Sequence, residues 1–195
     1  MVKLKRIIID IDGVLADYNG GMAQVIMELY NIEVPSNGKD ITDWYQYRNT
    51  IGRNLWKDVW KFVNDNPSFM CNLNPLASPY EFSRIESLNL NNDLYFVTNR
   101  ASIGIKIITE KWLMKHNISY PTVILSKHKG LIAAGLEADF IIEDSPKNII
   151  SIYRDSPKTK IYLMSYPYNK EVEYLATKCV NSIGEFLDDI NKVKS

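Results

Sequence analysis

Five short apolar runs, separated by stretches of helical periodicity, constrain the fold of this chain more than any other feature. The runs cover residues 4–10, 93–97, 122–125, 139–142 and 160–164. Helical patterns are found at residues 22–30, 50–63, 79–88, 103–116, 131–134, 147–153 and 182–193. Short runs rich in β-branched residues are typical of strands buried on both faces. The alternation therefore predicts an α/β fold, a Rossmann-like parallel sheet with helices on both faces.

Polar side chains follow four of these runs at the point where each run ends. They are Asp10 and Asp12, then Thr98-Asn99-Arg100, then Lys127 and Lys129, then Glu143-Asp144. The carboxyl ends of parallel strands meet at one edge of the sheet, where open α/β sheets bind their ligands. We therefore expect these side chains to lie together in one site.

The chemistry of this polar group indicates phosphoryl transfer with Mg²⁺. Four clustered carboxylates repel one another unless a cation compensates them, and hard oxygen ligands favour Mg²⁺. Threonine and lysine side chains can bind the oxygens of a phosphate group. A central carboxylate can act as a nucleophile, and a second acid two residues later can protonate the leaving alcohol and then activate water.

The charge balance and the cysteines exclude several other classes of protein. Lys+Arg and Asp+Glu both number 23, whereas a protein that coats nucleic acid needs a strong basic excess. Cys71 and Cys179 are far apart in the sequence, which argues against a disulfide framework or a zinc site. No apolar stretch has the length of a membrane span or of a signal peptide. We expect a soluble, cytoplasmic protein without a membrane partner.

The segment from Asp10 to Gly13, Asp-Ile-Asp-Gly, resembles the first motif of the haloacid dehalogenase (HAD) superfamily. The resemblance extends over essentially the whole chain. It implies that Asp10 is the nucleophile and Asp12 the general acid/base. The presence of Asp12 favours a phosphatase over a dehalogenase, because the dehalogenase branch lacks this second acid.

The other strand ends resemble the remaining motifs of that superfamily. The resemblance implies that Thr98 and Asn99 lie at the phosphate, although Asn99 could serve only as a helix cap. It also implies that Lys129 is the lysine of the third motif, with Lys127 as the alternative. Mg²⁺ would then be held by the Asp10 side chain, the Asp12 backbone carbonyl and the Asp144 carboxylate.

The longer stretch from Asp10 to Gly21 resembles the opening of the 5′(3′)-deoxyribonucleotidases, in which an aromatic residue follows Ala-Asp and Gly-Gly comes shortly after. This implies that residues 17–75 form a small helical cap inserted after the first strand, and that residues 1–16 and 76–195 form the core. By position, Tyr18 and Trp56 would line the pocket for the base. Two features depart from that family: asparagine follows Thr98 where serine is usual, and the fourth motif is Glu-Asp rather than Asp-Asp.

The sequence thus predicts a Mg²⁺-dependent phosphomonoesterase that removes phosphate from nucleoside monophosphates, with deoxyribonucleotides preferred, through an aspartyl-phosphate on Asp10. Its partner would be a small phosphomonoester and not a nucleic acid. A HAD phosphatase of another small substrate and a 3′-phosphatase of nucleic-acid ends are the alternatives. A homodimer stays open, and so does the role of Arg100, which could contact phosphate or lie on the surface.

Overall fold

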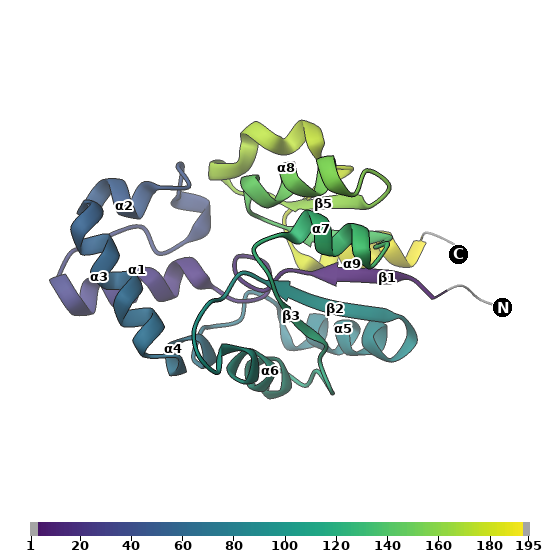
Figure 1. Cartoon of the computed structure of the whole chain (residues 1–195), viewed down its shortest axis with the longest axis horizontal. Helices are drawn as coiled ribbons and strands as arrows, with labels where there is room; N and C mark the ends of the chain where they lie inside the picture. Colours follow the sequence, from purple (N-terminus) through teal and green to yellow (C-terminus); the bar gives the residue numbers. More distant parts are fainter. Residues whose placement is uncertain (1–3, 193–195) are drawn as a thin grey trace.

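The computed structural model describes residues 4–192 and contains a six-stranded parallel sheet with the order β3-β2-β1-β4-β5-β6 (Figure 1). The strands are β1 (Arg6–Ile9), β2 (Asp93–Thr98), β3 (Val123–Leu125), β4 (Phe140–Glu143), β5 (Lys160–Met164) and β6 (Lys178–Val180). The predicted α/β fold with a parallel sheet is confirmed. Strand β6 was not predicted, because its three residues, Lys-Cys-Val, form no apolar run and two of them are exposed.

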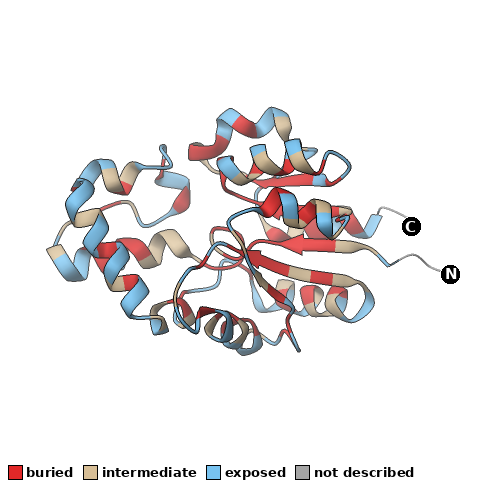
Figure 2. Cartoon of the chain, viewed as in Figure 1, coloured by how far each residue is buried: buried red, intermediate tan, exposed pale blue. Residues whose placement is uncertain are grey.

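Strand β1 lies at the centre of the sheet and is buried on both faces (Figure 2). Ile7 and Ile9 belong to one apolar cluster, which includes residues of α5, α6 and α9, whereas Ile8 packs with α7 and α8. This alternation follows from the pleat of a strand. The helices are α5 (Pro79–Asn91), α6 (Ile105–Lys115), α7 (Lys129–Gly135), α8 (Pro146–Asp155) and α9 (Ile183–Lys192). Because both faces are apolar, the acids of the first motif follow the last residue of β1, as predicted.

Four helices between β1 and α5 lie apart from the sheet, at the left of Figure 1, and we call them the cap. They are α1 (Tyr18–Tyr30), α2 (Gln46–Ile51), α3 (Arg53–Asp65) and α4 (Ser68–Cys71). The helix predicted at residues 22–30 begins four residues earlier, at Tyr18, because Asp17 accepts a hydrogen bond from Gly20 N and caps α1. The single helix predicted at 50–63 is two helices, because the chain breaks at Gly52, where φ is 82°.

The chain leaves the core and returns to it through two paired segments. Ala16 forms an antiparallel bridge with Pro75. Asp17 N donates to Asn74 O (2.8 Å), and Leu76 N donates to Leu15 O (2.7 Å). The predicted boundaries of the insertion, 16/17 and 75/76, fall at this pair of segments.

The cap also touches the core through two short 3-10 helices, η1 (Gly38–Asp40) and η2 (Pro167–Leu175). The ring of Trp44 lies edge-on to that of Tyr168, with 5.4 Å between the centroids. A Cβ atom at Gly38 would be 2.7 Å from the ring of Tyr166, so only glycine fits at this contact. The sequence analysis did not predict η2.

Candidate active site

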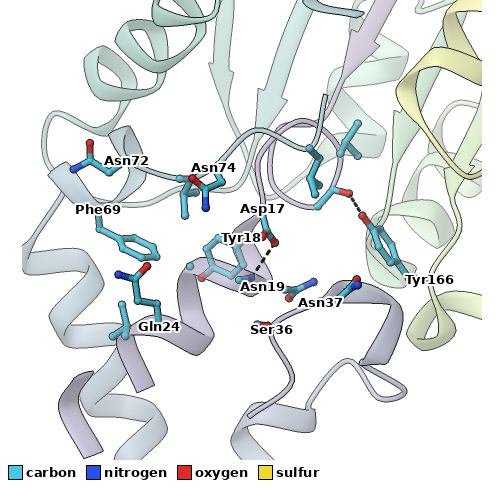
Figure 3. A pocket seen from close by; sticks show the side chains of 18 of the residues that line it. Asp17, Tyr18, Asn19, Gln24, Ser36, Asn37, Phe69, Asn72, Asn74 and Tyr166 are labelled. Atoms are coloured by element: carbon cyan, nitrogen blue, oxygen red, sulfur yellow. Dashed lines mark hydrogen bonds between the residues drawn. The ribbon is translucent and has the colours of Figure 1, made fainter. Parts of the chain in front are cut away.

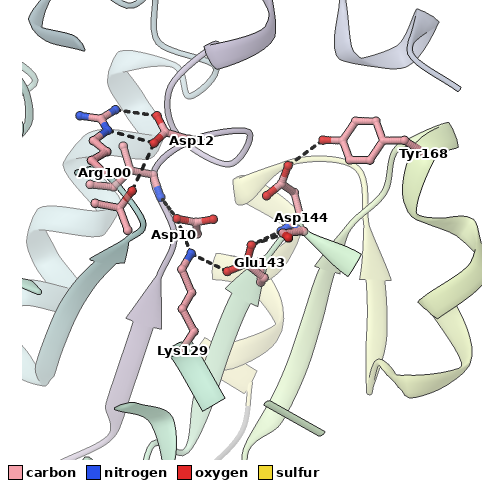
Figure 4. A network of polar contacts seen from close by, with 10 residues as sticks. Asp10, Asp12, Arg100, Lys129, Glu143, Asp144 and Tyr168 are labelled. Carbon is pink, nitrogen blue, oxygen red and sulfur yellow. Dashed lines mark hydrogen bonds and ion pairs between the residues drawn. The ribbon is translucent and has the colours of Figure 1, made fainter. Parts of the chain in front are cut away.

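Asp10 lies in a buried group of charges at the ends of β1 and β4 (Figure 4). Lys129 Nζ is 2.6 Å from Asp10 Oδ1 and 2.6 Å from Glu143 Oε2. The three side chains are at most 6% exposed. Lys129 is the first residue of α7 and is buried between these acids, whereas Lys127 is exposed. Lys129 is therefore the lysine that the fold brings to the site. We call Asp10, Lys129, Glu143 and Asp144 the acidic corner.

Local backbone geometry fixes the acidic corner in place. Glu143 Oε1 accepts hydrogen bonds from the backbone N–H groups of Asp144 (3.1 Å) and Ser145 (2.9 Å). Gly13 has a φ of 79°, and a Cβ atom there would be 2.3 Å from Asp144 Oδ2. Glycine is required at position 13 on both grounds, the left-handed backbone and the close approach of the carboxylate.

Burial and mutual repulsion shift the pKa values of these groups. Burial, with the charges of Glu143 and Asp144, raises the pKa of Asp10 well above its ordinary value, although Lys129 opposes the rise. Burial and Glu143 likewise raise the pKa of Asp144. Burial would also raise the pKa of Glu143, but Lys129 and the hydrogen bonds to Glu143 lower it overall. Burial would lower the pKa of Lys129, yet the two acids beside it raise it.

The donor set of the acidic corner fits a divalent cation. One carboxylate oxygen from each of Asp10, Glu143 and Asp144 can be chosen so that all lie within 4.8 Å of one another. Three carboxylates face a single ammonium group, so positive charge is needed before all of them can ionise. Glu143 is already bound to Lys129 and to two backbone N–H groups, which leaves Asp10 and Asp144 as the better placed metal ligands. Oxygen ligands of this kind suit Mg²⁺.

Asp12 lies outside the acidic corner and has partners of its own (Figure 4). Arg100 donates from Nη2 to Asp12 Oδ1 (2.6 Å) and from Nε to Asp12 Oδ2 (2.9 Å). The hydroxyl of Thr98 donates to Asp12 Oδ2 (3.2 Å). Arg100 also donates from Nη1 to Thr109 Oγ1 (3.1 Å) in α6. We call Asp12, Thr98, Arg100 and Thr109 the arginine corner.

The remaining predicted residues are placed as follows. Thr98 is the last residue of β2 and is buried, whereas Asn99 directly after it is exposed. Arg100 was expected either at phosphate or on the surface, but it is buried against Asp12. Tyr18 opens α1, and its hydroxyl is buried without a hydrogen-bond partner among the described residues. Burial, together with the charge of the neighbouring Asp12, raises the pKa of Tyr18.

A cavity of about 870 Å³ lies beside the site, between cap and core (Figure 3). Its described lining includes aromatic rings and many amide and hydroxyl groups, among them Tyr18, Asn19, Gln24, Asn37, Phe69, Asn72, Asn74 and Tyr166. The carboxylates of both corners are not among the described lining residues. Tyr18 thus connects the cavity with the neighbourhood of Asp12. Trp56 does not line the cavity; it packs on Tyr47 and Trp60 inside the cap.

Two tyrosines that the sequence analysis left out complete the site. Tyr168 donates from its hydroxyl to Asp144 Oδ2 (2.6 Å), and Tyr166 donates to Gly13 O (2.9 Å). Their rings stack on each other with a centroid distance of 5.0 Å. Both follow β5 at the same edge of the sheet as the other functional residues. The rule that located the other strand-end residues, applied to the fifth apolar run, would have found them.

Comparison with known proteins gives a family match over nearly the whole chain. The family described as 5′ nucleotidase, deoxy (Pyrimidine), cytosolic type C protein matches residues 4–189. No curated protein shows a significant sequence match. Among residues 4–192, no helix has the length and apolar character that a membrane crossing requires.

Solved structures of HAD hydrolases share this fold. A HAD family hydrolase from Deinococcus radiodurans with bound phosphate and sodium is 12% identical, with a TM-score of 0.65 over 98% of this chain and 97% of that one. A haloacid dehalogenase-like hydrolase from Streptococcus pneumoniae is 11% identical, with a TM-score of 0.67 and coverages of 96% and 98%. The HAD-hydrolase YfnB from Bacillus subtilis, bound to magnesium, is 16% identical, with a TM-score of 0.59 and coverages of 97% and 99%.

Proposed function

The chain belongs to the 5′ nucleotidase, deoxy (pyrimidine), cytosolic type C family and is a HAD-type phosphatase, and we propose that it hydrolyses deoxyribonucleoside monophosphates with Mg²⁺. The acidic corner is the observation that carries this proposal. Its three buried carboxylates around one lysine suit a metal ion and the phosphate that the ion would accompany. We also propose a cytosolic location, which the description of the family supports.

In the proposed reaction Asp10 attacks the phosphorus atom, and the bond from phosphorus to the leaving oxygen breaks. Asp12 gives its proton to that oxygen, so the product leaves as an alcohol. Asp12 then accepts a proton from water, whose oxygen attacks the phosphorus of the aspartyl-phosphate and releases phosphate from Asp10. Thr98, Asn99 and Lys129 are the residues proposed to hold the phosphate oxygens. Mg²⁺, held by Asp10, the Asp12 carbonyl and Asp144, would neutralise charge on the phosphate.

The cavity is the proposed site of the nucleoside. Its volume of about 870 Å³ lies within the range of small-molecule sites. Tyr18 belongs to its wall and lies near Asp12, so a substrate with its phosphate at Asp10 would pass Tyr18 on the way to the cap. Trp60 lies 6.3 Å from Tyr18 and 5.8 Å from Trp56, between ring centroids. We therefore propose that Tyr18 contacts the base and that Trp56 supports it through Trp60.

A substrate panel with and without Mg²⁺ tests the proposal. The panel contains deoxyribonucleoside and ribonucleoside 5′- and 3′-monophosphates, sugar phosphates and a 3′-phosphorylated oligonucleotide. We expect Mg²⁺-dependent phosphate release, fastest with deoxyribonucleotides. Turnover of sugar phosphates alone would refute the nucleotide assignment, and turnover of the oligonucleotide alone would establish the end-repair alternative.

Two variants assign the residues within the same experiment. Asp10→Asn should abolish phosphate release while its unfolding curve stays cooperative, and retained turnover would exclude Asp10 as the nucleophile. Tyr18→Ala should raise KM for nucleotides more than for a phosphate ester without a base, because only the former loses an aromatic contact.

A further inference from the structure

We propose that Arg100 is a positioning residue, which fixes the carboxyl group of Asp12 and directs its catalytic proton to a lone pair that the guanidinium group does not occupy. The inference rests on the proposed role of Asp12 as general acid/base. It concerns a residue that the sequence patterns assigned either to phosphate or to the surface. The contacts of the arginine corner carry it.

The guanidinium group of Arg100 is held at three nitrogens. Nε and Nη2 bind Asp12, and Nη1 donates to Thr109 Oγ1. Thr109 in turn donates its hydroxyl proton to the backbone oxygen of Ile105 (2.8 Å) at the start of α6, so its oxygen is free to accept from Arg100. The Arg100 side chain is 1% exposed. A helix therefore fixes the planar group that in turn fixes Asp12.

The contacts with Arg100 restrict where Asp12 can hold a proton. A carboxylate offers about four lone-pair positions, two on each oxygen. Two donors, Arg100 Nε and the Thr98 hydroxyl, occupy Oδ2, and one donor, Arg100 Nη2, occupies Oδ1. When the Thr98 hydroxyl donates to the phosphate instead, the open positions are those that the Arg100 fork does not take, one on each oxygen, and a proton on Asp12 belongs there. Asp12 is also the exposed partner of the pair, 21% against 1%, so its open side can meet a leaving group.

An arginine is required for this arrangement because its donors form a rigid fork. Lysine presents a compact charge on a flexible stem and cannot hold both oxygens of a carboxylate in one plane. Without the fork, Asp12 can rotate about its side-chain bonds, and its proton no longer points at the leaving oxygen. The loss falls on the step in which that oxygen must be protonated.

The dependence of rate on the leaving group tests this role. A nucleoside needs a proton to leave, whereas p-nitrophenolate leaves without one. We expect Arg100→Gln to lower kcat/KM, which covers the steps through formation of the aspartyl-phosphate and not its hydrolysis. The loss should be about 10–100-fold for a deoxypyrimidine 5′-monophosphate and less than about threefold for p-nitrophenyl phosphate, since general acid catalysis contributes about 10²–10⁴-fold. Asp12→Asn should show the same selectivity with a larger loss. A purely structural role would lower both rates equally.

Three further variants keep the test decisive even where Arg100→Gln does not fold. Arg100→Lys retains the charge without the fork and should lose activity with the same selectivity. Thr109→Val removes the outer support of Arg100 and should give a smaller selective loss. Arg84→Gln breaks the surface ion pair of Arg84 with Asp188 and should leave both rates unchanged. Equal losses on both substrates, or none, in the Arg100 variants would overturn the inference. A wild-type protein inactive on every phosphomonoester would instead overturn the proposed function.

Discussion

Asp10 and Asp12 are separated by one residue in the chain, yet they belong to corners of the site that differ in charge balance. The acidic corner sets three carboxylates against one lysine, all at most 6% exposed. The arginine corner pairs one carboxylate with one guanidinium and leaves the carboxylate 21% exposed. The first corner needs another cation to reach neutrality and the second does not. Binding of a cation should therefore change the charge balance of the acidic corner far more than that of the arginine corner.

Removal of the cation from each corner should give the largest difference. Lys129→Met leaves three buried acids without their counter-charge and should lower the free energy of unfolding by about 3–5 kcal/mol. Arg100→Met leaves one partly exposed acid and should cost about 1–3 kcal/mol. Urea unfolding without metal measures both. Equal losses would show that the two corners do not differ in the way their charges indicate.

Added Mg²⁺ should again distinguish the two corners, through a change in stability somewhat smaller than the losses above. An ion that binds only the folded protein stabilises it by about 2.7 kcal/mol at a hundredfold excess over its Kd. Thermal unfolding should show this gain in the wild-type protein and lose it in Asp144→Asn. Asp12→Asn keeps its backbone carbonyl and is the matched control, so it should retain the gain. Loss of the gain in both variants would contradict an ion located at the acidic corner.

The raised pKa values in the acidic corner should determine the direction in which stability changes with pH. The pKa values of Asp10 and Asp144 are raised on folding, so the folded protein binds more protons than the unfolded one above the ordinary value of 3.8. The stability of the metal-free protein should therefore fall as pH rises from about 4 through the folded-state pKa values, on the order of 1 kcal/mol per pH unit for one group. Urea unfolding with a chelator measures the slope, and Asp144→Asn should reduce it. A free energy of unfolding that increases with pH over this range would contradict the raised pKa values of Asp10 and Asp144.

The smallest expected effect concerns Tyr168, which orients Asp144. Tyr168→Phe removes the hydrogen bond to Asp144 Oδ2. It should weaken Mg²⁺ binding by about 10-fold, the lower end of the loss in affinity that follows when a residue that orients a metal ligand is replaced. Calorimetric titration gives the affinity. Tyr162→Phe is the control, because Tyr162 also donates to a carboxylate, that of Asp189, but away from the site. An unchanged affinity in Tyr168→Phe would show that Asp144 needs no such support.

Residues whose position follows from strand ends could be predicted from the sequence, and residues fixed by tertiary contacts could not. Ile7 to Ile9 indicate a buried strand, and the acids after them must lie at the edge of a parallel sheet. The role of Arg100 depends on Thr109 in α6, nine residues further along, and no local pattern connects the two side chains. The place of Trp56 in α3 depends on how α2 packs on α3, which propensity does not determine.

The paired segments at Ala16 and Pro75 have a consequence for how such proteins diversify. The insertion begins and ends at adjacent, hydrogen-bonded residues, so its two ends already meet on the core. At this junction the core imposes little on the length of the insertion, since lengthening a closed loop costs little free energy. The junction is a site of exchange, where an insertion of another length and sequence could replace this one without moving either aspartate. Substrate choice and chemistry can then change independently.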